Sequence, residues 1–167
     1  MTLKTLLILR HAKAKRNGWD DYERPLAKRG KRDAPRIGQL VEQIGLTPDL
    51  VVSSGAKRAL QTARRAAKAA GYTGEVMITE ALYFSGPDTH LDVLRRLPDD
   101  ADVVMIVGHN PTFEELVETL TGVDVSLPTA TLAEISLEID SWMEIDEMTG
   151  VLKDVHCPPS EDHTGDA

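Results

Sequence analysis

The amino-acid sequence predicts a single α/β domain of three layers, with helices on both faces of a mixed, mostly parallel sheet. A chain of 167 residues matches the usual size of one domain. Short apolar runs alternate along it with longer segments of helical periodicity, which is the pattern of α/β proteins. Neither a repeat nor a linker divides the chain, so we assign the domain to residues 1–158 and expect a flexible tail over residues 159–167.

The N-terminal half alternates between predicted strands and helices. Leu3–Arg10 is a continuous apolar run, as expected of a strand that is buried on both faces. Apolar residues recur at spacings of three and four within Ala27–Ile44, which predicts an amphipathic helix. Asp49–Ser54 is a second buried strand, and the Ala-rich segment Lys57–Ala70 is a helix that a glycine ends. Glu75–Thr79 is predicted to be a short strand.

The same alternation continues in the C-terminal half. Pro87–Leu97 is predicted to be a helix because it begins with proline and carries basic residues in its last turn. Ala101–His109 is the clearest strand of the sequence. Pro111–Gly122 begins with proline and ends with glycine, as helices commonly do. Thr131–Ile139 alternates with period two, which indicates a strand with one exposed face.

The last elements are predicted to form the antiparallel edge of the sheet. Val151–Cys157 has the pattern of an edge strand. Trp142–Gly150 fits two interpretations, a helical turn capped by Asp140 or a further strand. We expect His90, His156 and His163 to be solvated surface residues, because none stands in a spacing typical of metal ligands.

The composition excludes several classes of function. A net charge of −8 and an isoelectric point of about 5.1 disfavour binding to nucleic acids or through a polybasic membrane anchor. No apolar run approaches the roughly 20 residues of a membrane span, and Leu6–Leu9 is too short for the core of a signal peptide. Cys157 is the only cysteine, so an intrachain disulfide and a CxxC zinc site are excluded. We expect a soluble cytoplasmic protein without a metal or cofactor.

Polar residues follow three of the predicted strands. Arg10 and His11 end the first strand, Arg58 opens the helix after the second, and His109 ends the strand before the last helix. Ligands of open α/β sheets bind at the carboxyl ends of the strands. If these strands are neighbours, two histidines and two arginines meet there, next to helix N-termini that favour an anion.

These residue types suit the chemistry of a phosphate group. The planar guanidinium of arginine binds phosphate oxygens in pairs. A neutral imidazole can attack phosphorus, and a second, cationic histidine can stabilise the charge that develops. Each motif alone is more often a solvated loop or helix face, so the weight of the hypothesis rests on the motifs occurring together in this order.

The motifs resemble those of the histidine phosphatase superfamily, which has the phosphoglycerate-mutase-like fold. The segment "LILRHAKAK" is similar to its phosphate-binding signature, and "RPLAKRGKRDA", "VVSSGAKRALQTA", "TEALY" and "VGHNPTFEELVETLTG" are similar to the SixA-type phosphohistidine phosphatases. The resemblance extends from Leu3 to Pro158. It implies that His11 is a nucleophile that becomes phosphorylated, that Arg10 and Arg58 bind the phosphoryl oxygens, and that His109 is the second histidine of the phosphate site.

Three further positions follow from the resemblance. Arg24 in "RPL" matches an arginine that closes over the phosphate in SixA-type enzymes. Glu80 stands about where other members of the superfamily hold the acid that protonates the leaving oxygen, although a solvated residue at this position is an equally good interpretation. Ala12 replaces the usual glycine of the signature, and we expect its backbone to need no positive φ.

The resemblance implies a metal-independent phosphatase that acts through a phosphohistidine intermediate, with phosphohistidine on a protein as substrate. One alternative is a small-molecule phosphomonoesterase, in which Glu80 would be a true acid. A second alternative is a non-catalytic domain that binds phosphate or a phosphopeptide. A mutase is a weaker option, because the chain lacks room for the extra segments that would enclose a substrate. The sequence does not indicate an oligomeric state.

Overall fold

The computed structural model describes residues 3–159, which form one α/β domain. Of the predicted tail, only residue 159 lies within this range, and His163 lies outside it. The six strands form a single sheet in the order β3-β2-β4-β1-β5-β6. Their bounds are β1 Leu3–Arg10, β2 Leu50–Ser53, β3 Met77–Ile78, β4 Val103–Gly108, β5 Leu132–Glu138 and β6 Gly150–His156.

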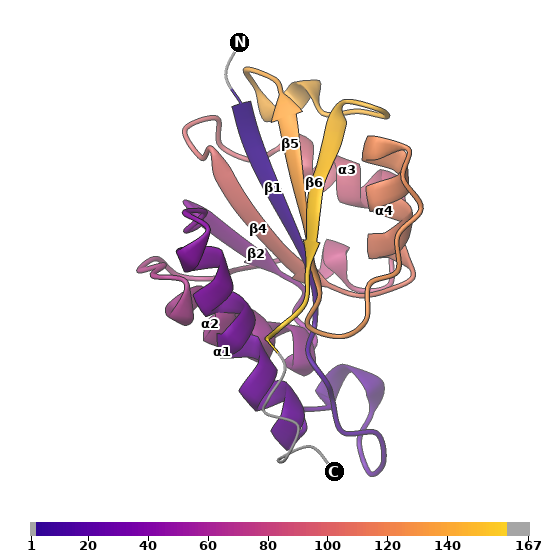
Figure 1. Cartoon of the computed structure of the whole chain (residues 1–167). Coiled ribbons are helices and arrows are strands. Elements are labelled where there is room, and N and C mark those ends of the chain that lie inside the picture. Colours follow the sequence, from indigo (N-terminus) through magenta and orange to yellow (C-terminus); the bar gives the residue numbers. More distant parts are fainter. Residues whose placement is uncertain (1–2, 160–167) are drawn as a thin grey trace.

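The sheet is mixed, as the sequence predicts. The neighbours β3, β2, β4 and β1 are parallel, whereas β5 runs antiparallel to β1 and β6 antiparallel to β5. The carboxyl ends of β2, β4 and β1 therefore lie side by side at one end of the sheet (Figure 1). The antiparallel edge at the C-terminus is confirmed.

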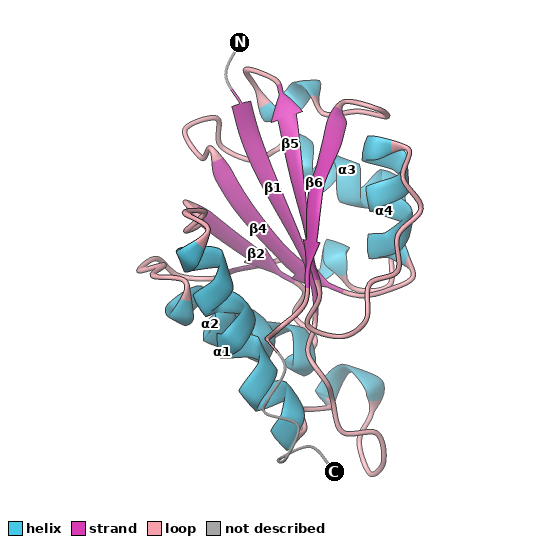
Figure 2. Ribbon diagram, viewed as in Figure 1, coloured by secondary structure: helices cyan, strands magenta, loops and turns pink. Residues whose placement is uncertain are grey.

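Four α-helices cover the two faces of the sheet (Figure 2). They are α1 Lys28–Gln43, α2 Lys57–Ala69, α3 Pro87–Arg95 and α4 Thr112–Thr121. The helices α1 and α2 lie on one face, and α3 and α4 lie on the other (Figure 1). Three short 3-10 helices connect the layers: η1 Asp21–Glu23, η2 Glu80–Leu82 and η3 Trp142–Glu144.

Strand β1 explains why the fold has three layers. Its side chains alternate, so that Leu6 and Ile8 join the core under α3 and α4 while Leu7 and Leu9 join the core under α1 and α2. All four are fully buried. Burying a leucine or isoleucine side chain contributes about 1.5–3 kcal/mol, so this one strand stabilises the contacts of both faces.

Helices α1 and α2 pack closely at a glycine. A Cβ atom on Gly38 would collide with the backbone carbonyl of Ala66 in α2. Glycine and proline usually weaken a helix interior, and α1 contains both Pro35 and Gly38. At Gly38 the loss of helix propensity is offset by the close approach of the two helices.

Two predicted boundaries need correction. The segment after β5 forms the 3-10 helix η3, but its cap is Ser141 rather than Asp140. The Ser141 side chain accepts a hydrogen bond from the backbone of Met143, and Glu144 completes a capping box. Strand β3 contains only Met77 and Ile78, because the chain leaves the sheet after pairing with two residues of β2.

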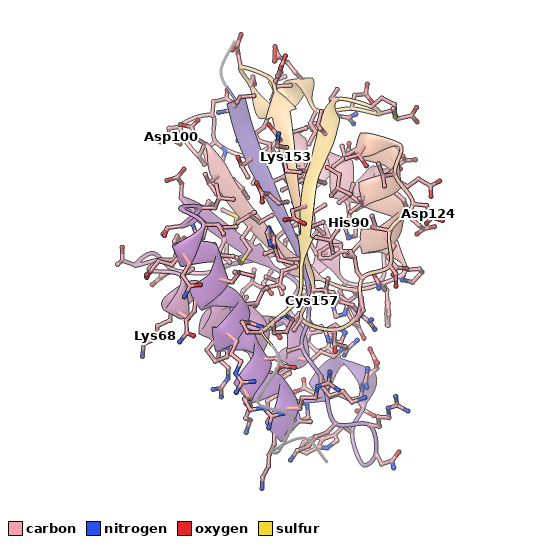
Figure 3. The ribbon with its side chains drawn as sticks, in the orientation of Figure 1. Lys68, His90, Asp100, Asp124, Lys153 and Cys157 are labelled. Carbon is pink, nitrogen blue, oxygen red and sulfur yellow. The ribbon has the colours of Figure 1, made fainter. Side chains whose placement is uncertain are left out.

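Two histidines that were expected at the surface are enclosed. His90, which is labelled in Figure 3, lies on α3 and is only 1% exposed. Its Nδ1 donates to the carbonyl of Gly86, and its ring meets that of Phe113 edge-on. Its position four residues before the buried Leu94 places it on the inner helix face. His156 is half-buried, and its Nε2 lies 2.9 Å from the carboxylate of Glu134.

Within residues 3–159 no helix is long and apolar enough to cross a membrane. The single cysteine, Cys157, is exposed just beyond the end of β6 (Figure 3).

Candidate active site

The strand register brings the two predicted site histidines together. Strands β1 and β4 are parallel, and Arg10 lies opposite Gly108. The next residues, His11 and His109, therefore leave the sheet side by side, and their ring centroids are 5.2 Å apart. Strand β2 adjoins β4 on its other side, which places the Oγ of Ser54 2.9 Å from the Nε2 of His109.

The hydrogen bonds of His11 determine its tautomer. Its Nδ1 lies 2.8 Å from the carbonyl oxygen of Ala12, which can only accept a hydrogen bond. The proton is therefore on Nδ1, and Nε2 carries a free lone pair. Burial lowers the pKa of His11 to about 4, and the positive charges of Arg58, Arg10 and Arg24 add to this effect. The ring is neutral at pH 7.

The alanine that follows His11 fits the fold without strain. Among the described residues, positive φ angles outside glycine occur only at Phe84, Ala130 and Met148, so Ala12 has an ordinary backbone conformation, as expected. Ala12 is fully buried, and its backbone N–H donates to the Oγ1 of Thr62 on α2 at 2.9 Å. This bond ties the signature segment to the helix that carries Arg58.

The two arginines that the strand ends predict both reach the site. Arg58 is buried on the first turn of α2, where its Nη1 donates to the backbone carbonyl of Asp21 at 2.6 Å and its Nη2 to the Asp21 carboxylate at 3.1 Å. The guanidinium of Arg10 donates to the carbonyl of Leu127 at 3.0 Å. Their charges lie close enough that Arg58 lowers the pKa of Arg10, after the larger effect of burial.

Arg24 also lies near this group of residues. Its Nη2 is 3.2 Å from the carboxylate of Asp21, and its Nη1 donates to the carbonyl of Lys15. Its charge contributes to the lowered pKa of His11. The Asp21 carboxylate thus bridges Arg24 and Arg58, and it also accepts a hydrogen bond from the hydroxyl of Tyr83 at 2.7 Å.

Three buried nitrogens of this group have no hydrogen-bond partner within the described part of the chain. They are Nε of Arg10, Nε of Arg58 and Nδ1 of His109. Buried polar atoms of native proteins are nearly always paired, and unpaired ones require an explanation. Burial, repulsion from a protonated His11 and the positive charge of Arg58 lower the pKa of His109 to about 3, so this ring is also neutral at pH 7. Neutral histidines beside charged arginines suit an anionic ligand.

Glu80 lies at the edge of the site rather than in it. Its side chain is exposed and accepts a hydrogen bond from the hydroxyl of Tyr22 at 2.7 Å. Gly55 lies directly beneath this bond, where a Cβ atom would collide with both partners. Among the described residues, no hydrogen bond or ion pair joins Glu80 to His11 or His109.

Sequence reasoning missed Asp21 and Tyr83. Asp21 precedes Arg24 by three residues, and an acid so close to a predicted phosphate-binding arginine was the available signal. Tyr83 and Phe84 are adjacent aromatic residues that begin three positions after Glu80, in a chain with only 4% aromatic residues. Residues 3–159 contain no group of three or more His, Cys, Asp or Glu side chains arranged to hold a metal ion.

Known proteins resemble this chain in both sequence and fold. A family model described as the histidine phosphatase superfamily (branch 1) matches residues 6–83. A proposed phosphohistidine phosphatase SixA from Nakamurella multipartitia has a TM-score of 0.83 and 27% identity, covering 96% of this chain and 99% of its own. A second, from Agrobacterium tumefaciens, has a TM-score of 0.77 and 29% identity, covering 93% and 98%. An uncharacterized protein of Mycobacterium tuberculosis is 29% identical, over 90% of this chain and 99% of its own.

These similarities agree with the topology described above. The six-stranded mixed sheet with helices on both faces is the phosphoglycerate-mutase-like fold, and the matched segment 6–83 contains His11, Arg24 and Arg58. The chain therefore shares the sequence signature and the fold of the histidine phosphatase superfamily.

Proposed function

We propose that the chain, a phosphatase by family, removes phosphate from phosphohistidine on a cytoplasmic protein through a covalent phosphohistidine at His11, without a metal ion. One observation carries the proposal. His11 is neutral, its Nε2 lone pair is free, and it lies beside His109 within the field of the arginines. This is the protonation state that an attack on phosphorus requires.

In the first step, Nε2 of His11 forms a bond to phosphorus while the bond from phosphorus to the leaving nitrogen breaks. Arg10 and Arg58 bind the phosphoryl oxygens, and their fixed positive charges neutralise the phosphate. The leaving imidazole departs as a neutral ring when its other nitrogen already carries a proton. In the second step, water attacks the phosphorus, the bond to Nε2 breaks, and inorganic phosphate leaves.

The site favours a nitrogen over an oxygen leaving group. An alkoxide needs a proton in the transition state, which a carboxylic acid with a raised pKa usually supplies. Burial raises the pKa of Asp21, but hydrogen bonds from Tyr83 and Arg58 and the charges of the arginines together outweigh it and hold this pKa below its usual range, so Asp21 is a charged acceptor. Within residues 3–159, Glu80 forms no hydrogen bond or ion pair with either histidine. Two structural relatives named as phosphohistidine phosphatases support the same substrate class.

The test is phosphate release from a phosphohistidine-bearing carrier protein and from p-nitrophenyl phosphate, both in EDTA. We expect rapid release from the carrier, loss of this activity in His11→Ala, and an acid-labile phosphate label on His11. His156→Asn serves as the matched control, because His156 lies on β6 and contacts Glu134 rather than the site. Release from the carrier that survives His11→Ala would overturn the mechanism.

Two alternatives make different predictions in the same assay. If the protein cleaves only the ester, it is a small-molecule phosphomonoesterase, for which the position of Glu80 at the site edge is the favouring observation. If it cleaves neither substrate and yet binds phosphate without any label on His11, it is a phosphate-binding domain.

A further inference from the structure

An exposed aromatic side chain stands beside the site and is not used by the mechanism above. Phe84 is 68% exposed, although large apolar side chains are normally buried. Its backbone has a φ of 45°, in the left-handed region that non-glycine residues rarely adopt. Both features cost free energy, and such strain tends to persist where function requires it.

The ring of Phe84 packs against Tyr83, which in turn contacts His109 of the candidate site. Its centroid lies 4.2 Å from that of Tyr83 and 6.2 Å from that of His109. The Tyr83 ring meets His109 edge-on at 5.5 Å. Tyr83 and Phe84, here called the aromatic pair, therefore continue outward from the two site histidines.

The aromatic pair is held in place by the phosphate-site residues. The Tyr83 hydroxyl donates to Asp21, the same carboxylate that pairs with Arg58 and Arg24. Burial and this hydrogen bond raise the pKa of Tyr83 to about 12, so the hydroxyl keeps its proton. The Tyr83 ring also meets that of Tyr22 edge-on at 5.0 Å. The pair thus has a fixed position relative to the arginines.

We propose that the aromatic pair is a subsite for a planar leaving group, namely the imidazole ring of the phosphohistidine substrate. This rests on the proposed function and extends it. A phosphate bound by the arginines beside His11 would direct its leaving group outward past His109, where Phe84 presents an exposed ring. Stacked and edge-to-face aromatic contacts add binding energy beyond the area that they bury. The pair would discriminate a ring from a leaving group without one.

Two small substrates with the same type of bond isolate this effect. Phosphoimidazole and phosphoramidate both contain a P–N bond, but only the first has a ring. We expect Phe84→Ala to lower kcat/KM for phosphoimidazole by about three- to tenfold and to change that for phosphoramidate less than twofold. The matched control is Met148→Ala, since Met148 is also exposed (67%) with a φ of 58° but contacts the end of α4 instead.

The outcomes separate this inference from the proposed function. Equal losses on both substrates, or no loss on phosphoimidazole, would overturn the subsite, and thermal unfolding of Phe84→Ala checks that the fold is intact. If the wild type cleaves neither P–N substrate but hydrolyses p-nitrophenyl phosphate, the proposed function fails. A selective loss on that ester in Phe84→Ala, with methyl phosphate unaffected, would then still support a subsite for planar rings.

Discussion

Replacing Ser54 by alanine should impair catalysis through His109. Ser54 is fully buried, and its Oγ lies 2.9 Å from the Nε2 of His109 while it accepts a hydrogen bond from the backbone N–H of Ala56 at 3.1 Å. Within the described residues its hydroxyl proton has no other acceptor, so we assign it to Nε2. His109 then carries its own proton on Nδ1, the buried nitrogen that lacks a partner. This is the nitrogen that would donate to a phosphoryl oxygen.

The magnitude follows from the two bonds that Ser54→Ala removes. A buried polar group left without its partner costs about 1–3 kcal/mol. Without the hydrogen bond from the Ser54 hydroxyl to Nε2, His109 can change tautomer, so that its Nδ1 no longer donates. We therefore expect kcat/KM to fall by about 10- to 100-fold, with most of the loss in kcat if the donation strengthens in the transition state. The loss at the N–H of Ala56 affects stability instead.

Ser53 provides a control of the same type and burial. Its Oγ donates to the backbone carbonyl of Ser54 at 2.9 Å, and among the described residues it forms no hydrogen bond with His109. Both substitutions should reduce the free energy of unfolding by about 1 kcal/mol, measured by urea denaturation. Only Ser54→Ala should lower kcat/KM for the phosphorylated carrier, and only Ser54→Ala should change the ¹⁵N shifts of the His109 ring. Equal losses of activity in the two variants, or activity of Ser54→Ala within threefold of wild type, would refute the reasoning.

Three further predictions concern pH, the acid and charge. The pKa of a histidine in an unfolded chain is about 6.5, whereas the pKa is about 4 for His11 and about 3 for His109 in the folded protein. As the pH falls below 7, the unfolded chain therefore binds more protons than the folded one. The free energy of unfolding should therefore drop by about 2–4 kcal/mol between pH 7 and 5, and replacing both histidines by asparagine should flatten this dependence. Glu80→Gln should leave kcat/KM for the carrier within about threefold, whereas a loss of 10²-fold or more on alkyl phosphates would identify Glu80 as an acid. Residues 13–32 contain eight basic and three acidic side chains, so raising the salt concentration from about 0.1 to 1 M should lower kcat/KM for the carrier several-fold; an unchanged value would argue against steering by this segment.

The sheet was predictable because its strands are buried on both faces. An apolar run such as Leu3–Arg10 has few alternatives to a central strand. Edges were harder, since β3 pairs through only Met77 and Ile78, and both of these are exposed. The burial of His90 could have been predicted, because it lies four residues before Leu94 on the same helix face. A polar residue on an apolar helix face is, however, easily assigned to the surface.

The strand ends made the convergence of four candidate residues predictable, whereas the contacts made by the loops were not predictable. His11, Arg10, Arg58 and His109 follow the chain direction of β1, β2 and β4, so the register alone brings them together. Asp21 reaches Arg58 across 37 positions of sequence, and its place depends on how the loop after β1 folds over α2. No local pattern encodes such a contact, which is why the acceptor shared by the two arginines emerged only in the structure.

The site combines positively charged arginines with neutral histidines, and this combination suits the proposed attack on phosphorus. The arginines remain positive even when burial lowers the pKa of Arg10, because guanidinium groups do not lose their protons in proteins. Their charges in turn help to keep His11 neutral, which preserves the lone pair that would attack phosphorus in the proposed mechanism. A bound phosphate would offset those charges and favour the protonated form of a neighbouring histidine. The Nδ1–H of His11 is bonded to the carbonyl of Ala12, which leaves the lone pair on Nε2. The Nδ1 of His109 has no such partner and is available to share a proton with the phosphoryl group. Two histidines 5.2 Å apart thus differ in role because their hydrogen bonds differ.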